Sequence, residues 1–571
     1  MEHQFAKTAY RNCLLWGIIS SMSVTICTII DAVLIGNFVG SNGLAIVGIA
    51  TPVFMLFACL GTTVAVGSNV LIGRALGAGD RQKANQVMGK QLFVGILLGL
   101  LLLAVSLCFQ NHVITFLGAR GTLFSLAKAY LLPVFVASPL FVLYHILSMS
   151  VRTDGNSRLA AFASGVVIAT NLLLDILLMG YFHWGIRGAS VSLCIAELFG
   201  VLLLLTHFGR KLSILRLSVS VPKIADGKEF VRNGFGVGSA YIFQALVMLI
   251  FNRLLLSDEV NGVLYESIFG VLYIISTIPQ AFFDGAGGAL APAVSIFAGE
   301  QDGQSILTVL WQGIIFTGVV SLAFVGLFQP GAASILSFFG IEETALVIAV
   351  PVFRLFSISF LFSGINILMT DFWQTVGRAR LAGVMSVLRN FVVILFLGVL
   401  LIPRFQITGL AAAYVCAEAF CFVIVLLVLA ISPSKKYVTQ RFSPVGRVFE
   451  KYYSISTDSV GDISADVERL CEEWEILPKQ AFFLNFITEE ILLNIIKFGL
   501  KDTEKEHYID IKLLEGEDSY TLRIRDNVKA YDPFATEGDR IDNAVLQMIR
   551  TRAKDCEYQR KLIFNYLYLV I

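Results

Sequence analysis

The chain has 571 residues, of which 56% are hydrophobic and only 15% are charged. This composition, with a mean hydropathy of +0.76, excludes an ordinary soluble protein and predicts many membrane spans. The net charge of +1 averages two unlike parts, because residues 441–571 carry 18 Lys/Arg and 24 Asp/Glu whereas the preceding residues carry 25 and 18. We therefore expect a membrane region that ends near Ser432, then a mildly acidic soluble domain with no nucleic-acid partner.

Apolar stretches long enough to cross a bilayer recur throughout the membrane region. The first follows a short polar N-terminus without a small-residue cleavage site, so we interpret it as a span rather than a removable signal peptide. The twelve predicted spans lie near 13–36, 44–71, 91–109, 129–151, 159–180, 187–208, 234–256, 263–290, 306–328, 347–372, 382–402 and 410–431.

Lys and Arg residues gather in alternate loops of this pattern, whereas the opposite loops are nearly bare. The link between the sixth and seventh spans contains Arg210, Lys211, Arg216, Lys223, Lys228 and Arg232. Because positively charged loops stay on the cytoplasmic side, we expect both termini in the cytoplasm and a multi-pass protein of the plasma (inner) membrane.

The two halves of the membrane region repeat each other. The stretch RTDGNSRLA from Arg152 returns as QTVGRARLA from Gln374, with five of nine positions identical at a spacing of 222 residues. The loop GAGDRQ (77–82) has a weaker echo in AGEQDG (298–303). Internal duplication is the architecture of secondary transporters. We predict two six-helix lobes, residues 1–220 and 221–434, and a third domain at 435–571.

Three polar residues lie inside predicted spans of the first half. Asp31 lies in the first span, and Asn171 and Asp175 lie four residues apart in the fifth, which places them on one helix face. An ionisable group at membrane depth is costly and by default marks an ion path. Either proton exchange or coordination of Na⁺ by oxygen atoms would use these groups. For Asp284, Asp371 and the repeat-related pair Glu197/Glu418, a structural role is the better interpretation.

The tail alternates between helical and strand patterns. Residues 462–474 and 477–500 have helical periodicity, and HYIDIKLLE and YTLRIRD alternate as two strands joined through Gly516. A helix near 542–552 and a final strand near 562–570 complete the predicted fold. The fold class is therefore a mostly α membrane protein with a C-terminal cytoplasmic α+β sandwich.

The opening segment, from DAVLIGNFVG to DRQKANQVMG, resembles multidrug and toxic compound extrusion (MATE) transporters, especially their DinF-like branch. NLLLDILLM followed by GIRGAS is similar to the fifth and sixth spans of that branch. The resemblance covers residues 10–431 and implies an antiporter coupled to H⁺ or Na⁺ that exports small amphipathic or cationic substrates. It places the coupling residues at Asp31, Asn171 and Asp175. The hydroxyl that this branch often supplies in its sixth span falls on Leu193, next to Ser192.

In the tail, EEILLNIIKFG resembles the N-box of GHKL-type ATPases, most closely the anti-sigma-factor serine kinases. The resemblance implies that Glu490 activates water or a hydroxyl and that Asn494 ligates the Mg²⁺ of Mg-ATP. RDNVKAYDP resembles the adenine-binding box and retains Asp526 and Asp532, but Val528 replaces its glycine. The glycine-rich lid should fall near 543–549, where there is no glycine. The resemblance thus predicts a degenerate regulatory domain with a cytoplasmic protein partner, or else a working nucleotide site.

We thus predict a cation-coupled multidrug antiporter, which is not an enzyme, with a fused regulatory domain. One alternative is a lipid or polysaccharide flippase of the same superfamily, although that function favours a more basic cavity than Arg253, Arg354 and Arg389 provide. The other alternative is a membrane-anchored serine kinase or partner-switching signalling protein, for which the spans would act as a sensor.

Overall fold

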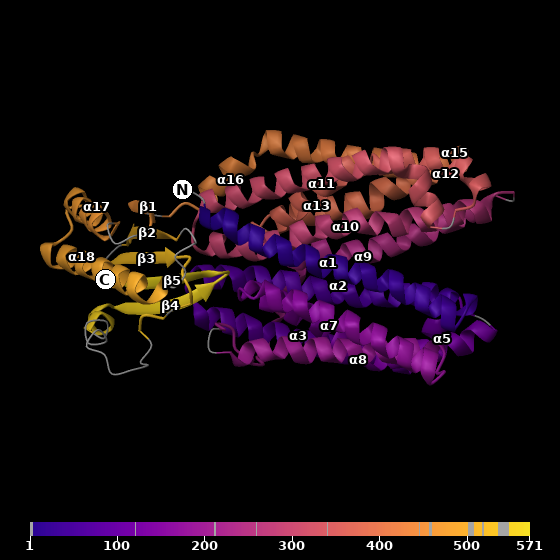
Figure 1. Cartoon of the computed structure of the whole chain (residues 1–571), viewed down its shortest axis with the longest axis horizontal. Coiled ribbons are helices and arrows are strands. Elements are labelled where there is room, and N and C mark those ends of the chain that lie inside the picture. The colour runs from indigo at the N-terminus through magenta and orange to yellow at the C-terminus, as the bar shows by residue number, and fades with distance from the viewer. Residues whose placement is uncertain are drawn as a thin grey trace.

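The computed structural model describes residues 4–571 except 120, 211–212, 259, 340, 445, 456–458, 501–506, 517–518, 531 and 535–547. Two helical lobes lie side by side, and a small domain of strands and helices lies against one end of both (Figure 1). We call this end of the bundle the domain-side end. The first helix begins there, so the start of the described chain and the C-terminal domain share one end of the molecule.

The first lobe is built from long apolar helices, because a helix satisfies its own backbone hydrogen bonds in a medium without water. Its elements are α1 (Gln4–Phe38), α2 (Ser41–Gly77), α3 (Arg81–Cys108), α4 (Gln110–Phe116), α5 (Thr122–Val136), α6 (Ser138–Thr153), α7 (Ser157–Asp175), the π-helix η1 (Ile176–Tyr181), α8 (Ile186–Leu205) and the 3₁₀ helix η2 (Thr206–Gly209).

The second lobe repeats this plan. Its elements are α9 (Ile224–Leu256), α10 (Gly262–Gly299), α11 (Gly303–Phe338), α12 (Glu343–Ser357), α13 (Phe360–Thr375), α14 (Ala379–Val387), the π-helix η3 (Leu388–Val392) and α15 (Val393–Ile431).

The chain is a multi-pass membrane protein. Ten described helices are long and apolar enough to cross a membrane, or eleven if the pair Leu123–Val136 and Ser138–Thr153, bent by 50°, forms one broken span. The run Ala379–Ile431 has 53 residues and is interrupted at Gln406, whose φ of 53° is not helical. Unbroken, such a run would measure about 80 Å, far more than the hydrocarbon core of a bilayer. The number of twelve spans stays a prediction.

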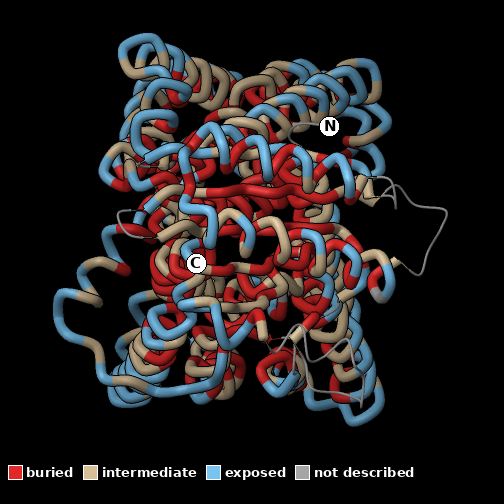
Figure 2. The backbone as a smooth tube through the Cα atoms, turned by 90° about the vertical axis from the view of Figure 1, so that its left-hand side faces the viewer, coloured by how far each residue is buried: buried red, intermediate tan, exposed pale blue. Residues whose placement is uncertain are grey.

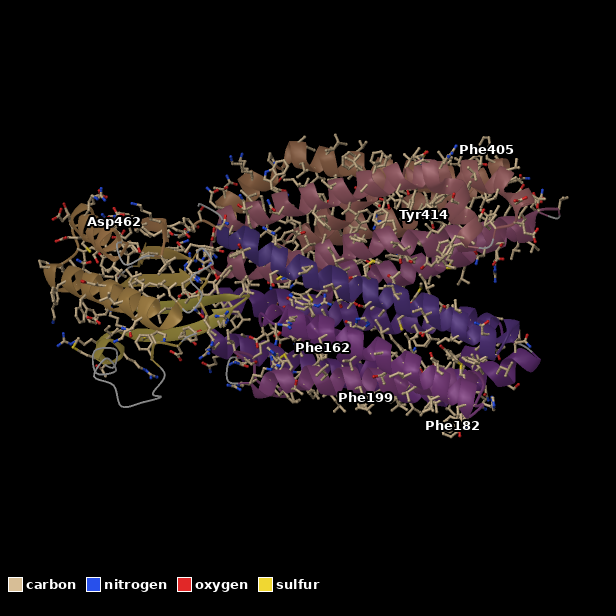
Figure 3. The ribbon with its side chains drawn as sticks, viewed as in Figure 1. Phe162, Phe182, Phe199, Phe405, Tyr414 and Asp462 are labelled. Atoms are coloured by element: carbon tan, nitrogen blue, oxygen red, sulfur yellow. The ribbon has the colours of Figure 1, made fainter. Side chains whose placement is uncertain are left out.

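Aromatic side chains cover the outer surface of the helical bundle. Phe162, Phe182 and Phe199 project outward from the first lobe, and Phe405 projects from the second (Figure 3). Each of them exposes at least half of its surface. Tyr414, by contrast, lies inside the second lobe. Exposed rings of this kind suit a surface in contact with lipid tails rather than with water.

The lobes meet through α1 and α2 on one side and α9 and α10 on the other. Glycines allow the helix backbones to come close, since a Cβ atom on Gly67 would lie 1.9 Å from the Phe230 carbonyl oxygen and one on Gly77 would lie 2.0 Å from that of Ile296. Small residues at helix contacts are typical of membrane bundles. The domain-side ends of the lobes are therefore packed directly against each other.

The C-terminal domain is one antiparallel sheet with two helices on one face. The short helix α16 (Ser434–Arg441) leads from α15 into it, and the strand order is β1-β2-β3-β5-β4. Its elements are β1 (Val448–Ser454), α17 (Ser459–Glu473), α18 (Pro478–Asn494), the π-helix η4 (Ile495–Gly499), β2 (Tyr508–Glu515), β3 (Tyr520–Asp526), β4 (Asp555–Lys561) and β5 (Phe564–Val570).

The two faces of this sheet have different partners. Ile509, Ile511 and Ile524 face α17 and α18 and form a hydrophobic core with them. The alternate residues, which include Asp510 and Arg523, are also buried, because that face lies against the helical bundle. Viewed end-on, the buried strands cross the middle of the molecule with helices of the two lobes above and below (Figure 2).

Two features of the tail differ from the sequence prediction. The sequence of residues 435–456 predicts a linker that enters a strand; the structure has the strand, β1, but begins this segment with helix α16. The sequence predicts no strand at β4, whose sequence DCEYQRK is polar and lacks the β-branched residues that favour strands. Residues 548–552 of the predicted helix are helical, but Tyr531 and most of the predicted lid lie outside the described residues.

Candidate functional site

The three polar residues predicted to bind the coupling ion lie together inside the first lobe. The Asn171 side-chain amide donates to Asp31 Oδ1 at 2.7 Å and to Asp175 Oδ2 at 3.1 Å. Asn171 and Asp175 are each 1% exposed, and Asp31 is partly buried. One amide thus joins two carboxyl groups that belong to different helices, α1 and α7.

The local fold at this site departs from a regular α-helix. Asp175 is the last residue of α7, and the π-helix η1 follows it at once. The spacing of four residues places Asn171 and Asp175 on one face of α7, as predicted. A π-helical turn widens the backbone locally, and such turns occur frequently at functional sites.

Two further side chains complete the group. Ser192 on α8 donates a short hydrogen bond to Asp175 Oδ1, and the Cys27 thiol lies 3.6 Å from Asp31 Oδ2. The resemblance places this hydroxyl at Leu193, next to Ser192, and in the structure it is the Ser192 side chain that reaches Asp175. Cys27 precedes Asp31 by one helical turn, and this (i, i+4) spacing was the signal in the sequence that could have identified it.

The group can bind a small hard cation or a proton. Its oxygen atoms come from two carboxyl groups, one hydroxyl and the Asn171 amide, whose Oδ1 has no hydrogen-bond partner among the described residues. Oxygen atoms of these types are the ligands preferred by hard cations. Two carboxyl groups that share one amide donor also favour the uptake of one positive charge between them.

The second lobe holds a different polar group. Arg389 of η3 forms a salt bridge with Glu418 of α15 at 2.8 Å, and Asn366 donates to the same carboxylate at 2.7 Å. These groups border a cavity of about 140 Å³ whose wall includes Tyr273 and Tyr414. Drug-sized ligand pockets are typically about 300–1,000 Å³, so this cavity is too small for such a substrate in the described conformation.

The residues predicted to bind nucleotide lie in the C-terminal domain, where several of them form hydrogen bonds within the domain. The Asn494 side chain donates to the Glu490 carbonyl at 2.8 Å on α18. Asp526 accepts from the Asn565 amide at 2.7 Å and from the Val528 backbone at 3.0 Å, while Asp532 accepts from the Phe534 backbone at 2.9 Å. Desolvation raises the pKa of Asp526 to about 6.

The valine that replaces the motif glycine fills the space beside the N-box helix. A Cβ atom on Gly499 would lie 2.6 Å from a methyl carbon of Val528, whose side chain is 1% exposed. Val528 therefore occupies space that a glycine at this position of the motif would leave open. Among the described residues there is no group of three or more His, Cys, Asp or Glu that could hold a metal.

Comparison with known proteins supports the membrane part of the predicted identity. Residues 17–177 match the family model MatE. The multidrug export protein MepA of Staphylococcus aureus (strain MRSA252) is 24% identical over 436 residues, which cover 75% of this chain and 95% of that protein. MepA of Staphylococcus saprophyticus is 24% identical over 417 residues, covering 72% and 90% respectively.

Solved structures show the same fold. An outward-facing multidrug resistance MATE family transporter of the MOP superfamily superposes with a TM-score of 0.70 at 17% identity, covering 76% of this chain and 96% of that one. A MATE structure in complex with MaL6 has a TM-score of 0.70 at 18% identity and covers 76% and 97%. The membrane part of the chain therefore has the fold of MATE family transporters and resembles multidrug export proteins in sequence; such secondary transporters are not enzymes. The DinF-like branch stays a prediction.

Proposed function

We propose that this protein is a multidrug efflux antiporter, in which the group formed by Asp31, Asn171, Asp175 and Ser192 binds the coupling H⁺ or Na⁺. The observation that carries the proposal is the Asn171 amide held between two carboxyl groups inside the first lobe. The MepA relatives are named multidrug export proteins, which favours small amphipathic or cationic substrates. A flippase is disfavoured because the one arginine beside the cavity, Arg389, is paired with Glu418.

The domain-side end is proposed to face the cytoplasm. Basic side chains such as Arg74, Arg81 and Lys90 lie near this end, as the positive-inside rule requires of cytoplasmic loops. The protein would then be a multi-pass protein of the plasma membrane whose C-terminal domain is available to a cytoplasmic protein partner.

In the proposed mechanism, binding of the cation changes the contacts between helices of the first lobe. The Asn171 amide and the Ser192 hydroxyl hold the two carboxyl groups in place when no cation is bound. A proton or Na⁺ on Asp175 would compete with these donors and loosen the contacts among α1, α7 and α8. Ion binding thereby favours one arrangement of the lobes over the other, which is the differential affinity that coupling requires.

Substitution of the two carboxyl groups tests this proposal. Asp31→Asn and Asp175→Asn keep the side-chain size but remove the charge, so each should reduce cation-driven efflux from proteoliposomes to the protein-free background. The assay uses a panel of dyes with an imposed H⁺ or Na⁺ gradient, which identifies the coupling ion in the same experiment. Asp284→Asn is a matched control outside the group. Unchanged efflux in both variants would exclude the assignment.

For the C-terminal domain we propose a degenerate GHKL-like regulatory module. This proposal is supported by the packing of Val528 against Gly499 and by the hydrogen bond from the Asn565 amide to Asp526. Mg-ATP titrated into the full chain should then give no binding signal, and Asn494→Ala should change nothing. Saturable binding that Asn494→Ala abolishes would favour the alternative in which this domain is a working nucleotide-dependent module.

A further inference from the structure

The charged face of the C-terminal sheet is buried, and the proposed transport mechanism does not explain this burial. In an antiparallel sheet with one covered face, the alternate polar residues normally face water. Here they are buried: Asp510, Arg523 and Arg525 expose no more than 2% of their surface. Burial of charges is costly unless they are paired, so this face is shaped for the surface it touches.

One part of that surface belongs to the second lobe. Glu300, at the end of α10, accepts from Arg523 at 2.9 Å and lies 3.5 Å from Arg525. Within the sheet, Asp510 pairs with the same two arginines at 2.7 and 2.9 Å. The Glu300 side chain is 1% exposed, so it supplies a fully buried counter-charge from outside the domain.

Another part belongs to the first lobe. Lys561 donates to the Gly77 carbonyl at 3.3 Å, and Gln559 donates to the Gly79 carbonyl at 3.2 Å. Gly77 is the last residue of α2, where the helix dipole favours a cation. Nearby, Arg81 forms a partly exposed salt bridge with Glu557 at 2.8 Å.

The two anchoring points are related by the internal repeat. The first lies in the loop GAGDRQ and the second in its echo AGEQDG, and Gly77 and Gly299 are 222 residues apart. These loops flank the seam at which α2 packs against α10. In a transporter with two repeated halves, this end can open only if the two loops separate.

We propose that the C-terminal domain is a releasable clamp that holds the domain-side ends of the two lobes together. The attachment to the second lobe includes a buried ion network around Glu300. The attachment to the first lobe includes the hydrogen bonds to Gly77 and Gly79, the partly exposed Arg81–Glu557 pair, and the packing of Phe5 of α1 against Tyr508 and Phe564. Exposed pairs contribute little to stability, whereas breaking buried ones is costly. Separation of the lobes must therefore break contacts of the sheet with one of them, and the Arg81–Glu557 pair is the contact that costs least to break.

The test measures opening of the seam in the full chain, reconstituted in nanodiscs so that both ends are accessible. Ser295 is 1% exposed on α10 and lies against Gly73 of α2, so Ser295→Cys reports exposure of the seam through its rate of reaction with a hydrophilic maleimide. Accessible native cysteines are replaced first. Ala298→Cys, at a position that is 2% exposed, serves as a second reporter.

Lys561→Met, which keeps the apolar stem, should raise the labelling rate about fivefold, because the hydrogen bond from the buried amino group to the Gly77 carbonyl is lost. Arg81→Glu, which lies on the lobe and leaves the domain intact, should raise it about threefold, as expected for an exposed pair. Adding Glu557→Arg to Arg81→Glu should restore the slow rate. Arg552→Glu, at an exposed arginine of the same domain, should change nothing.

Wild-type labelling rates in both Lys561→Met and Arg81→Glu would overturn the clamp, as would faster labelling in Arg81→Glu that Glu557→Arg does not reverse. The interpretation of the seam as a gate rests on the proposed transport function, but the labelling assay does not measure transport. If the wild-type chain exports no dye but the variants show these labelling rates, the clamp is supported and the proposed transport function is not. If the chain exports dye but the variants are labelled at the wild-type rate, only the transport function is supported.

Discussion

Glu197 of the first lobe and Glu418 of the second are repeat-related residues 221 positions apart, and their surroundings differ. Glu418 is paired with Arg389 at 2.8 Å and accepts from Asn366 at 2.7 Å. For Glu197, one carboxyl oxygen has no hydrogen-bond partner among the described residues. The second lobe therefore supplies a cation of its own to its carboxylate.

The same contrast holds between Glu418 and the two carboxyl groups of the proposed coupling site. In the first lobe, Asp31 and Asp175 share an amide and a hydroxyl but have no salt bridge to Lys or Arg within the described chain. Carboxyl groups without a salt bridge can respond to a cation from outside, whereas a carboxylate held in an internal ion pair is already neutralised. The comparison teaches that two similar lobes differ in the partners of their carboxyl groups, and this difference is why we propose ion coupling at the first-lobe group.

The largest effect that tests this comparison is on stability. Glu418→Gln should lower the free energy of unfolding by about 2–3 kcal/mol, because the partly buried Arg389 would lose its charged hydrogen-bond partner. Glu197→Gln should change it by less than about 1 kcal/mol, since no buried cation loses its partner there. Unfolding of both purified variants in detergent, followed by tryptophan fluorescence against temperature, measures the difference.

Removing both partners of the pair gives the control. Arg389→Met combined with Glu418→Leu replaces the pair by apolar side chains and should recover most of the lost stability, because a buried pair contributes little beyond its apolar replacement. Equal destabilisation by Glu418→Gln and Glu197→Gln would show that the two lobes do not differ in the way we infer.

A smaller effect is expected at the hydroxyl of the first lobe. Ser192→Ala removes a hydrogen bond to Asp175 and should lower cation-driven efflux about tenfold, as for the loss of a hydrogen bond to a charged group. Ser192→Thr retains the hydroxyl and should keep most of the activity. Ser190 lies two residues away on α8 and donates to the Arg187 carbonyl instead, so Ser190→Ala is the matched control. Similar losses in Ser192→Ala and Ser190→Ala would point to general damage of α8.

Much of the first-lobe site could be predicted from the sequence, because its signals are local and unusual. Carboxyl groups inside apolar spans are rare enough to notice, and helical spacing alone brings Asn171 and Asp175 together. The sequence did not identify Ser192 as the hydroxyl that bonds Asp175, because a serine on a helix has no such signal. The hydrogen bond of Ser192 depends on how α7 and α8 are rotated against each other, and the spacing of residues along the chain does not specify this rotation.

The docking of the tail could not be predicted at all. Strand alternation correctly indicated two faces, but the charged face of β2 and β3 has the pattern of a surface exposed to water. Only the three-dimensional arrangement places Glu300 next to Arg523, 223 residues away in the chain. Strand β4 was not predicted for a related reason. Its polar residues, including Gln559 and Lys561, face the helical bundle rather than a hydrophobic core, so the sequence lacks the hydrophobic alternation of a strand.

The smallest expected effect concerns Cys27, whose thiol lies 3.6 Å from Asp31. A thiol is a weak donor, so Cys27→Ala should change the efflux rate by less than about threefold, well below the effect of Ser192→Ala. Cys27→Ser supplies a stronger donor at the same place and should hold the Asp31 carboxylate at least as firmly. Initial rates of dye efflux under one fixed gradient compare the variants. A loss in Cys27→Ala as large as that in Ser192→Ala would mean that the hydrogen bonds of Asp31 matter for coupling as much as those of Asp175.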